Sequence, residues 1–200
     1  MEVCTIIQSA HVHAKMKLGG TELPSPTAAL KFVAVGRGVQ NYTCSAAGAV
    51  PVAIGAVATL YDFTSLAYTS ESTLNTVPPT IVYTPISSAS GATLTVSGVG
   101  TFPMIGHHYF AADGTPTFDL STVGDILFCK KIAAVNAPVS ANNGPDGTGA
   151  VPWLMLSDNG GSVGLSQVYR VVTAGGKAPA TCPDTNLISI QYAAEYWLFG

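Results

Sequence analysis

The strict alternation of side chains near the end of the chain is the feature that most constrains the fold. In the segment Leu187–Phe199, apolar and aromatic residues occupy every second position, and polar or aromatic residues stand between them. One set is Ile188, Ile190, Tyr192, Ala194, Tyr196 and Leu198, and the other includes Ser189, Gln191, Glu195 and Trp197. Because successive side chains of a strand point to opposite faces, this period of two predicts a half-buried β-strand.

The remaining segments predict further short strands and few helices. No 3.6-residue pattern persists beyond two turns, and turn signals such as Asp113-Gly114, Asn159-Gly160-Gly161 and Gly175-Gly176 separate several apolar runs. The predicted fold is all-β, a single-domain antiparallel β-barrel or β-sandwich with few short helices. The other expected strands are Leu30–Val35, Val39–Cys44, Val50–Tyr61, Thr93–Val96, Met104–Phe110, Ile126–Val135, Trp153–Leu156 and Gln167–Thr173.

The chain divides into an N-terminal arm, residues 1–28, and a single β domain, residues 29–200. Glycine and proline interrupt the arm at Gly19, Gly20, Pro24 and Pro26, and little apolar periodicity survives there. Two hundred residues suffice to bury a sizeable core and to enclose a cavity. A homodimer is a reasonable expectation, because two-fold dimers are the commonest soluble oligomers.

Low charge excludes several classes of partner. The chain has 8 Lys and Arg and 11 Asp and Glu, which gives a net charge of -3 and about 10% charged residues. Eight scattered cations form no phosphate-neutralising stripe, so we expect no nucleic-acid partner. We also expect no membrane partner, since the uncharged stretch Gly38–Tyr61 is interrupted by Gly48, Pro51 and Gly55 and suits two strands and a turn.

Four cysteines and the N-terminal sequence bear on the cellular compartment. The first 20 residues lack the continuous apolar core of a secretory signal, so the expected location is cytoplasmic, with secretion as the alternative. No C-x-x-C pair is present, and zinc binding is not expected. Whether Cys44 and Cys182 form a disulfide is left open, because it depends on whether the fold brings them together.

Residues 72–112 form an unusually long uncharged stretch between Glu71 and Asp113. Solvated loops are rarely so poor in charge. One interpretation is a set of buried strands joined by Ser- and Thr-rich turns. The other is that the stretch, with Phe102 and Met104, walls an apolar ligand cavity.

Five sequence blocks, in order along the chain, resemble a fungal and bacterial family of unknown function. They are LKFVAVGRGVQNYTC (Leu30–Cys44), GHHYF (Gly106–Phe110), VPWL (Val151–Leu154), VYRVVTAGGKAPATC (Val168–Cys182) and YAAEYWLF (Tyr192–Phe199). Fungal members of that family are often automatically labelled malate dehydrogenase. We reject that activity, because neither Gly36-Arg37-Gly38 nor Gly98-Val99-Gly100 continues as the G-x-G-x-x-G turn that binds a dinucleotide.

The chain is also similar to fungal hetero-Diels–Alderases of tropolone-sesquiterpenoid pathways, which join a quinone methide to a humulene-type terpene. The similarity implies a cofactor-independent pericyclase of secondary metabolism that binds an apolar polyketide or terpenoid and promotes its cyclisation. Such catalysis needs two reactants held in a near-attack geometry and hydrogen-bond donors aimed at the developing charge. The alternative is a non-catalytic secreted binding or surface protein.

Aromatic and polar residues within these blocks and the uncharged stretch supply the candidate site. The candidate donors are His108, Tyr109, Arg170 and Tyr192, and the candidate substrate-binding residues are Trp153, Trp197, Phe102 and Met104. Each has a structural alternative: His108 as a hydrogen-bonded core residue, and Arg170 as the partner of Glu195 across the sheet. No metal site is predicted, because the adjacent His107 and His108 of a strand point to opposite faces.

Overall fold

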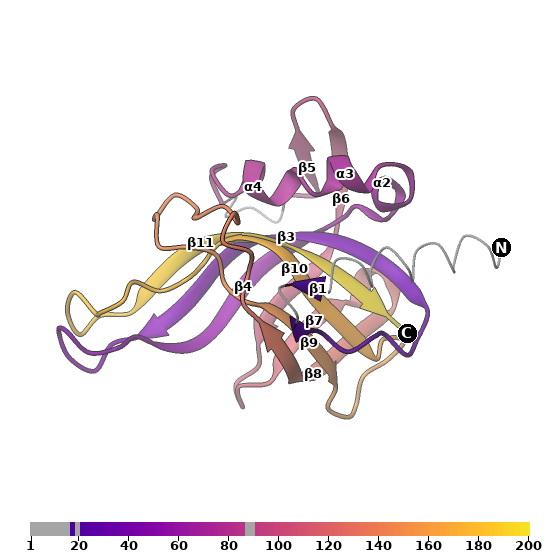
Figure 1. The fold of residues 1–200 in the computed structure, drawn as a ribbon. Coiled ribbons are helices and arrows are strands. Elements are labelled where there is room, and N and C mark those ends of the chain that lie inside the picture. Colours follow the sequence, from indigo (N-terminus) through magenta and orange to yellow (C-terminus); the bar gives the residue numbers. More distant parts are fainter. Residues whose placement is uncertain (1–16, 19–20, 87–90) are drawn as a thin grey trace.

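The computed structural model describes residues 17–18, 21–86 and 91–200, and they form a mainly antiparallel β-structure with a few short helices (Figure 1). The predicted fold class is confirmed. The strands are β1 (Lys17–Leu18), β2 (Thr21–Glu22), β3 (Leu30–Thr43), β4 (Val52–Asp62), β5 (Thr93–Val96), β6 (Gly100–Phe110), β7 (Pro116–Leu120), β8 (Asp125–Val135), β9 (Trp153–Asp158), β10 (Gln167–Gly175) and β11 (Ile188–Phe199). The helices are α2 (Thr64–Thr69), α3 (Glu71–Leu74), α4 (Val77–Ile81) and the 3-10 turn η1 (Ser121–Val123).

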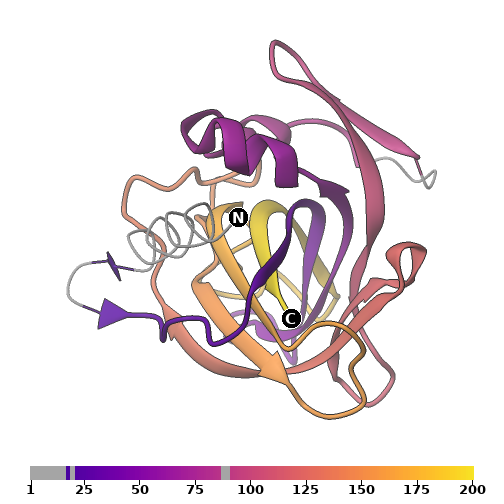
Figure 2. The same ribbon diagram turned by 90° about the vertical axis from the view of Figure 1, so that its right-hand side faces the viewer.

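The main sheet has nine strands and curls into a barrel. Its order is β4-β3-β11-β10-β9-β8-β7-β6-β5, and β4 pairs additionally with β6. In that extra pairing Ala58 lies opposite His108 and Leu60 opposite Gly106, so eight strands are hydrogen-bonded in a ring. Figure 2 shows these strands arranged around a common axis. Only the last part of β4 takes part in this closure, and the long strands β3, β4 and β11 project beyond the barrel on the left of Figure 1.

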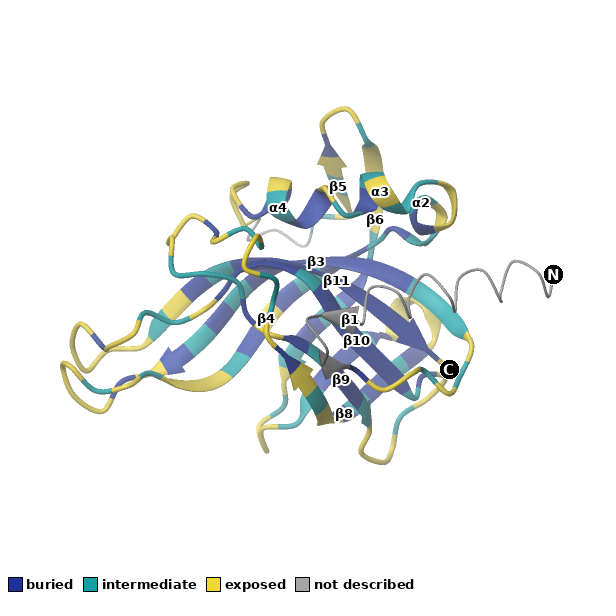
Figure 3. Cartoon of the chain, viewed as in Figure 1, coloured by how far each residue is buried: buried dark blue, intermediate teal, exposed yellow. Residues whose placement is uncertain are grey.

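The alternation of side chains along β11 separates two apolar clusters, one on each face of the sheet. The interior face carries Tyr192, Ala194, Tyr196 and Leu198, whose cluster includes Leu60, Phe118 and Leu127 from the opposite wall. The outer face carries Ala193, Trp197 and Phe199, whose cluster reaches residues of the helices. Because both faces of β11 are covered, this strand is buried on both sides rather than half-buried (Figure 3).

The short helices form a layer over the outer face of the sheet (Figure 1). Each has only 4 to 6 residues, too few for stability in isolation, so burial of Leu74, Val77 and Ile81 against the outer cluster must hold them. Helix α2 begins shortly after Asp62, whose carboxylate accepts a hydrogen bond from the Thr64 backbone N–H at 2.8 Å. This layer accounts for the first part of the uncharged stretch.

The last part of the predicted arm, residues 21–28, is attached to the barrel. Leu23 is buried in the outer cluster. The Thr27 backbone N–H donates to the Gln167 side chain at 2.8 Å, and the Tyr169 hydroxyl donates to the Pro24 carbonyl at 2.7 Å. Residues 1–16 and 19–20 of the predicted arm lie outside the described residues.

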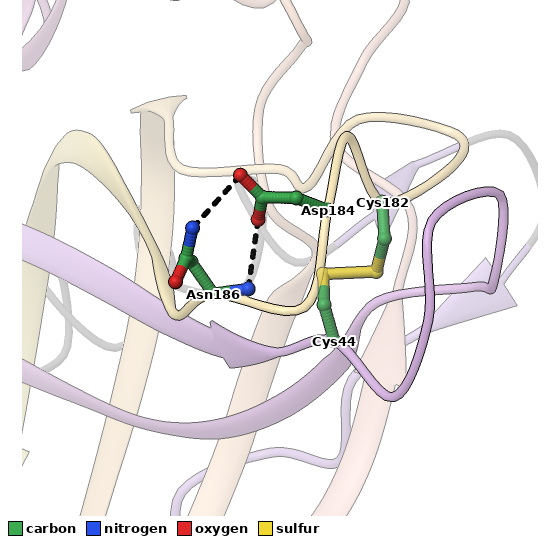
Figure 4. The surroundings of a disulfide bond; sticks show 4 residues. All are labelled: Cys44, Cys182, Asp184 and Asn186. Atoms are coloured by element: carbon green, nitrogen blue, oxygen red, sulfur yellow. Dashed lines mark hydrogen bonds between the residues drawn. A yellow bond between two sulfur atoms is a disulfide. The ribbon is translucent and has the colours of Figure 1, made fainter.

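Cys44 and Cys182 form a disulfide, with Cα atoms 5.7 Å apart (Figure 4). This bond resolves the question that the sequence left open. The Cys182 N–H also donates to the Ala49 carbonyl at 2.7 Å, and the Gly48 N–H donates to the Cys182 carbonyl at 2.8 Å. The loop after β3 and the loop before β11 are therefore joined covalently and by backbone hydrogen bonds.

Candidate functional site

Three of the four predicted donors lie together inside the barrel. His108, Arg170 and Tyr192 belong to β6, β10 and β11, and all three are buried. The hydroxyl groups of Tyr192 and Tyr196 are hydrogen-bonded at 2.9 Å. The Arg170 guanidinium donates to the Pro152 carbonyl from Nε at 3.3 Å and from Nη2 at 2.9 Å. We call His108, Arg170, Tyr192 and Tyr196 the interior cluster.

His108 is held as a neutral imidazole. Its Nδ1 lies 2.9 Å from the Thr117 carbonyl oxygen, and its ring stacks on Phe118 at a centroid distance of 4.2 Å. The pKa of His108 is lowered to about 4, mainly because burial disfavours the charged ring. The hydrogen bond to Thr117 opposes this shift, and the positive charge of Arg170 adds to it. At neutral pH the Nδ1–H therefore donates to Thr117.

Acidification is expected to destabilise the fold through His108. The imidazole takes up a proton near its ordinary pKa of 6.5 in the unfolded chain, but only near 4 in the folded protein. The unfolded state binds more protons between these values, so stability falls as the pH decreases through that window. We expect His108 to remove about 2 kcal/mol of unfolding free energy at about pH 5.

Urea denaturation between about pH 7 and about pH 4.5 measures this loss. In His108→Asn, whose amide keeps a donor for Thr117, the pH profile should be flatter. His107→Asn is the matched control, since His107 lies on the outer face, and it should retain the full acid dependence. An equally steep profile in both variants would contradict the assignment to His108.

The predicted pairing of Arg170 with Glu195 is wrong, because the two side chains lie on opposite faces of the sheet. Arg170 is opposite Tyr196 in the β10–β11 register, and Val171 is opposite Glu195. Paired residues share a face, so Arg170 points into the barrel and Glu195 points outward. There the Trp197 indole N–H donates to Glu195 at 2.9 Å. Among the described residues, no carboxylate forms an ion pair with Arg170.

The other predicted site residues lie away from the interior cluster. Tyr109 points to the outer face of β6, since it is adjacent to the inward-facing His108. Trp197 is buried in the outer cluster. Phe102 and Met104 pack at the margin of that same cluster. Three of the predicted donors, His108, Arg170 and Tyr192, therefore lie on the inner face of the sheet, whereas Tyr109 and the predicted substrate-binding residues lie on its outer side.

Trp153 lines a cleft of about 350 Å³ on the outer face, which we call the Trp153 cleft. Its volume lies near the lower end of the range of small-molecule sites. It is bounded by the helical layer, the loop 138–142 and β10. The lining residues are Asn75, Pro79, Pro138, Ser140, Ala141, Asn142, Trp153, Val172 and Thr173. Two of them, Asn75 and Pro79, come from the uncharged stretch, for which the wall of a ligand cavity was one of two interpretations.

Within the described part of the chain, two buried polar atoms of the Trp153 cleft have no hydrogen-bond partner. They are the indole nitrogen Nε1 of Trp153, which is a donor, and the amide oxygen Oδ1 of Asn75, which is an acceptor. Trp153 as a whole is only 6% exposed. Buried polar groups are nearly always hydrogen-bonded, and an unpaired one costs about 1–3 kcal/mol. An unpaired donor and an unpaired acceptor therefore lie in the walls of this cleft. Both atoms have almost no exposed surface, so a ligand would reach them only after a small movement of the two side chains.

The backbone beneath the cleft is strained. Strand β10 bulges between Val171 and Ala174, and Val172 in the bulge has φ of 46°. A β-branched residue rarely adopts this left-handed conformation, and such strain occurs preferentially at functional sites. The Thr173 hydroxyl donates to the Val151 carbonyl at 2.7 Å and so helps to hold the bulge. The side chain of Val172 lines the cleft as a result.

Sequence reasoning identified Trp153 but not its neighbours in the cleft. Asn75 follows α3, and helices this short leave no sequence signal of their own. Val172 is an ordinary strand residue in the sequence, and nothing in the local pattern marks it as bulged. Asn142 had a detectable signal, since Asn142-Asn143-Gly144 is typical of a turn.

The comparisons with known proteins identify the family. The family model "Protein of unknown function (DUF3455)" matches residues 24–200, nearly the whole chain. The chain belongs to the DUF3455 family. Its family match begins at Pro24, close to the predicted end of the arm. No curated protein and no solved structure matches this family member.

The described residues contain neither a membrane-crossing helix nor a cluster of metal-binding side chains. The helices in this part of the chain lack the length and apolar character that a membrane-crossing helix needs. In residues 17–18, 21–86 and 91–200, no three His, Cys, Asp or Glu side chains lie in a group suited to a metal ion.

Proposed function

We propose that the protein binds a small, mostly apolar, conjugated molecule in the Trp153 cleft without a cofactor. The observation that carries this proposal is the pair of unpartnered atoms, Trp153 Nε1 and Asn75 Oδ1, in one cleft whose other walls are largely apolar. A ligand with one acceptor and one donor would satisfy both atoms once a small movement of the two side chains exposes them. The indole and proline rings favour a flat ligand, because they offer apolar faces on which a conjugated ring can lie.

Loss of the indole N–H is expected to weaken binding of a ligand that carries a hydrogen-bond acceptor. Carbostyril, a flat bicyclic lactam with one N–H and one carbonyl, is a suitable probe, and naphthalene has a similar shape without polar groups. In Trp153→Phe we expect carbostyril affinity to fall about three- to tenfold, the value of one neutral hydrogen bond. Naphthalene affinity should change much less. Ligand titration by calorimetry or NMR measures both.

Trp197→Phe is the matched control for this experiment. It removes an indole from the same apolar cluster, but the Trp197 N–H already donates to Glu195 and Trp197 does not line the cleft. The ratio of carbostyril to naphthalene affinity should therefore stay at the wild-type value. Equal loss of both probes in Trp153→Phe, or failure of wild-type protein to bind carbostyril at all, would reject the proposed function.

The resemblance to hetero-Diels–Alderases extends the proposal to catalysis. We infer that the Trp153 cleft orients a quinone methide, whose oxygen would accept from Trp153 Nε1 as charge grows there, for addition to a humulene-type terpene. His108, Arg170 and Tyr192 do not line this cleft, so they would not act as donors in it. Incubation with both reactants, followed by product analysis, tests this step. If the protein binds the reactants but the reaction rate and the product stereochemistry equal those in buffer, the non-catalytic alternative is supported.

The disulfide supports secretion over the cytoplasm. Structural disulfides persist mainly in oxidising compartments, and Cys44–Cys182 is the disulfide that the described residues contain. Mass spectrometry of the protein isolated under alkylating conditions from its natural source would show whether these thiols are oxidised there.

A further inference from the structure

A second cleft, of about 600 Å³, lies where β3 and β10 leave the barrel. We call it the Tyr42 cleft. Its lining residues are Tyr42, Val50, Pro51, Thr148, Val151, Pro152, Lys177, Ala178, Pro179 and Ala180. Most of the lining is apolar, and Lys177 is its one charged residue. The hydroxyl of Tyr42 donates to the Gly176 carbonyl at 2.6 Å, so the ring of Tyr42 is fixed in place.

The disulfide joins two of the segments that line the Tyr42 cleft, and residues 148–152 form a third part of its wall. Val50 and Pro51 follow the loop that begins at Cys44, and Ala178 to Ala180 precede Cys182. The Cys182–Ala49 and Gly48–Cys182 backbone hydrogen bonds tie the same two segments. The cleft is therefore held open at a defined width rather than formed by two independent loops.

Arg170 places a positive charge beneath the Tyr42 cleft. Arg170 donates to the carbonyl of Pro152, which lines the cleft, and its charge lowers the pKa of Tyr42 against the larger raising effect of burial. No carboxylate of the described chain pairs with this guanidinium, although buried charges are normally compensated. At the rim, Lys177 adds a second cation.

We propose that the Tyr42 cleft binds an amphipathic anion, a carboxylate with an apolar body. The apolar body would lie on the proline, valine and alanine side chains that line the cleft, and the carboxylate would face Lys177 with the positive charge of Arg170 beneath it. This site is distinct from the Trp153 cleft and shares no lining residue with it. Arg170 acts here as a positioning residue through its charge, since Tyr42 and Pro152 lie between it and the cleft.

Three probes with the same tail and different head groups test the proposal: decanoate, decanol and decyltrimethylammonium. We expect decanoate to bind at least about tenfold more tightly than decanol, and the cation to bind least, because the cleft is positively charged. Arg170→Gln should reduce the preference for decanoate over decanol, whereas Arg170→Lys should keep most of it. Lys177→Gln should lower decanoate affinity about two- to threefold, a value typical of an exposed charge.

Control variants separate the site from general effects on folding. Lys130→Gln removes an exposed cation from β8 and should leave all three affinities unchanged. Ala178→Trp fills the cleft and should abolish binding of both decanoate and decanol, whereas Ala134→Trp, exposed on β8, should not. Because the preference between two probes is measured in one variant, partial loss of stability does not mimic the result.

Equal affinity for decanoate and decanol, or decanoate binding that survives Ala178→Trp, would overturn the proposal. Trp153→Phe should not change decanoate affinity. Binding of decanoate without binding of carbostyril would therefore support the Tyr42 site and reject the proposed function of the Trp153 cleft. Binding of carbostyril without binding of decanoate would reject the Tyr42 site and leave the proposed function standing.

Discussion

Replacement of Gly38 by alanine is expected to lower the free energy of unfolding by about 3 kcal/mol or more, at the upper end of overpacking effects. A Cβ atom at position 38 would lie 1.9 Å from the Val57 carbonyl oxygen and 2.6 Å from the Ala58 Cα. Both atoms belong to the backbone of β4, so no side-chain rotation can relieve the clash. The β3–β4 register, which pairs Gly38 with Ala58, would have to distort. Chemical denaturation monitored by circular dichroism measures the change.

Gly48→Ala is the control for this prediction. Gly48 has φ of 81°, and no heavy atom lies within 4 Å of the Cβ that alanine would add. Only the conformational cost of a left-handed residue remains, about 1–2 kcal/mol. If Gly38→Ala were no more destabilising than Gly48→Ala, the close approach of β3 to β4 would not be the reason for glycine at position 38.

Removal of the disulfide in the double variant Cys44→Ser/Cys182→Ser is expected to lower the unfolding free energy by about 2–4 kcal/mol. The bond joins residues 138 positions apart in the sequence, so its loss releases a large loop in the unfolded chain. Two of the segments that line the Tyr42 cleft would also lose their covalent link. Guanidinium denaturation of the oxidised protein and the double variant measures the stability difference.

Treatment of both proteins with a reducing agent is the control for the disulfide prediction. Reduction should destabilise the wild-type protein by about the same amount and leave the double variant unchanged, because Cys129 is the free cysteine among the described residues and it is buried. If the oxidised wild-type protein were no more stable than the double variant, the disulfide would contribute nothing to the free energy of unfolding.

Gly36 and Gly38 were correctly excluded from a dinucleotide-binding turn, but the sequence did not reveal that close packing requires glycine at both positions. The sequence showed that Gly36-Arg37-Gly38 is not a dinucleotide-binding turn. It did not show that the Tyr196 ring would lie 2.6 Å from a Cβ at position 36, or that β4 passes over position 38. The predicted break between the strands Leu30–Val35 and Val39–Cys44 was wrong for this reason, since the glycines lie within one continuous strand, β3. Close backbone approach depends on the partner strand, which local sequence does not specify.

Prediction of the candidate site was partial for a similar reason. Trp153 was predicted as a substrate-binding residue, and it lines a cleft in which its indole N–H has no partner among the described residues. His108, Arg170 and Tyr192 were predicted to share a site, and they do share the barrel interior. Their separation from Trp153 could not be predicted, because it depends on which face of each strand becomes the inside of the barrel. The short strand Pro116–Leu120 was also missed, although it carries the carbonyl that binds His108.

The amino-acid sequence alone determined the class of local structure. The period of two in Leu187–Phe199, the scarcity of helical patterns and the turn residues are local properties, and they were enough to predict an antiparallel β-domain with His107 and His108 on opposite faces. Tertiary structure decided the closure of β4 onto β6, the Cys44–Cys182 bond and the position of both clefts. These depend on pairings between segments far apart in the chain, whose register is chosen by the packing of whole faces rather than by neighbouring residues.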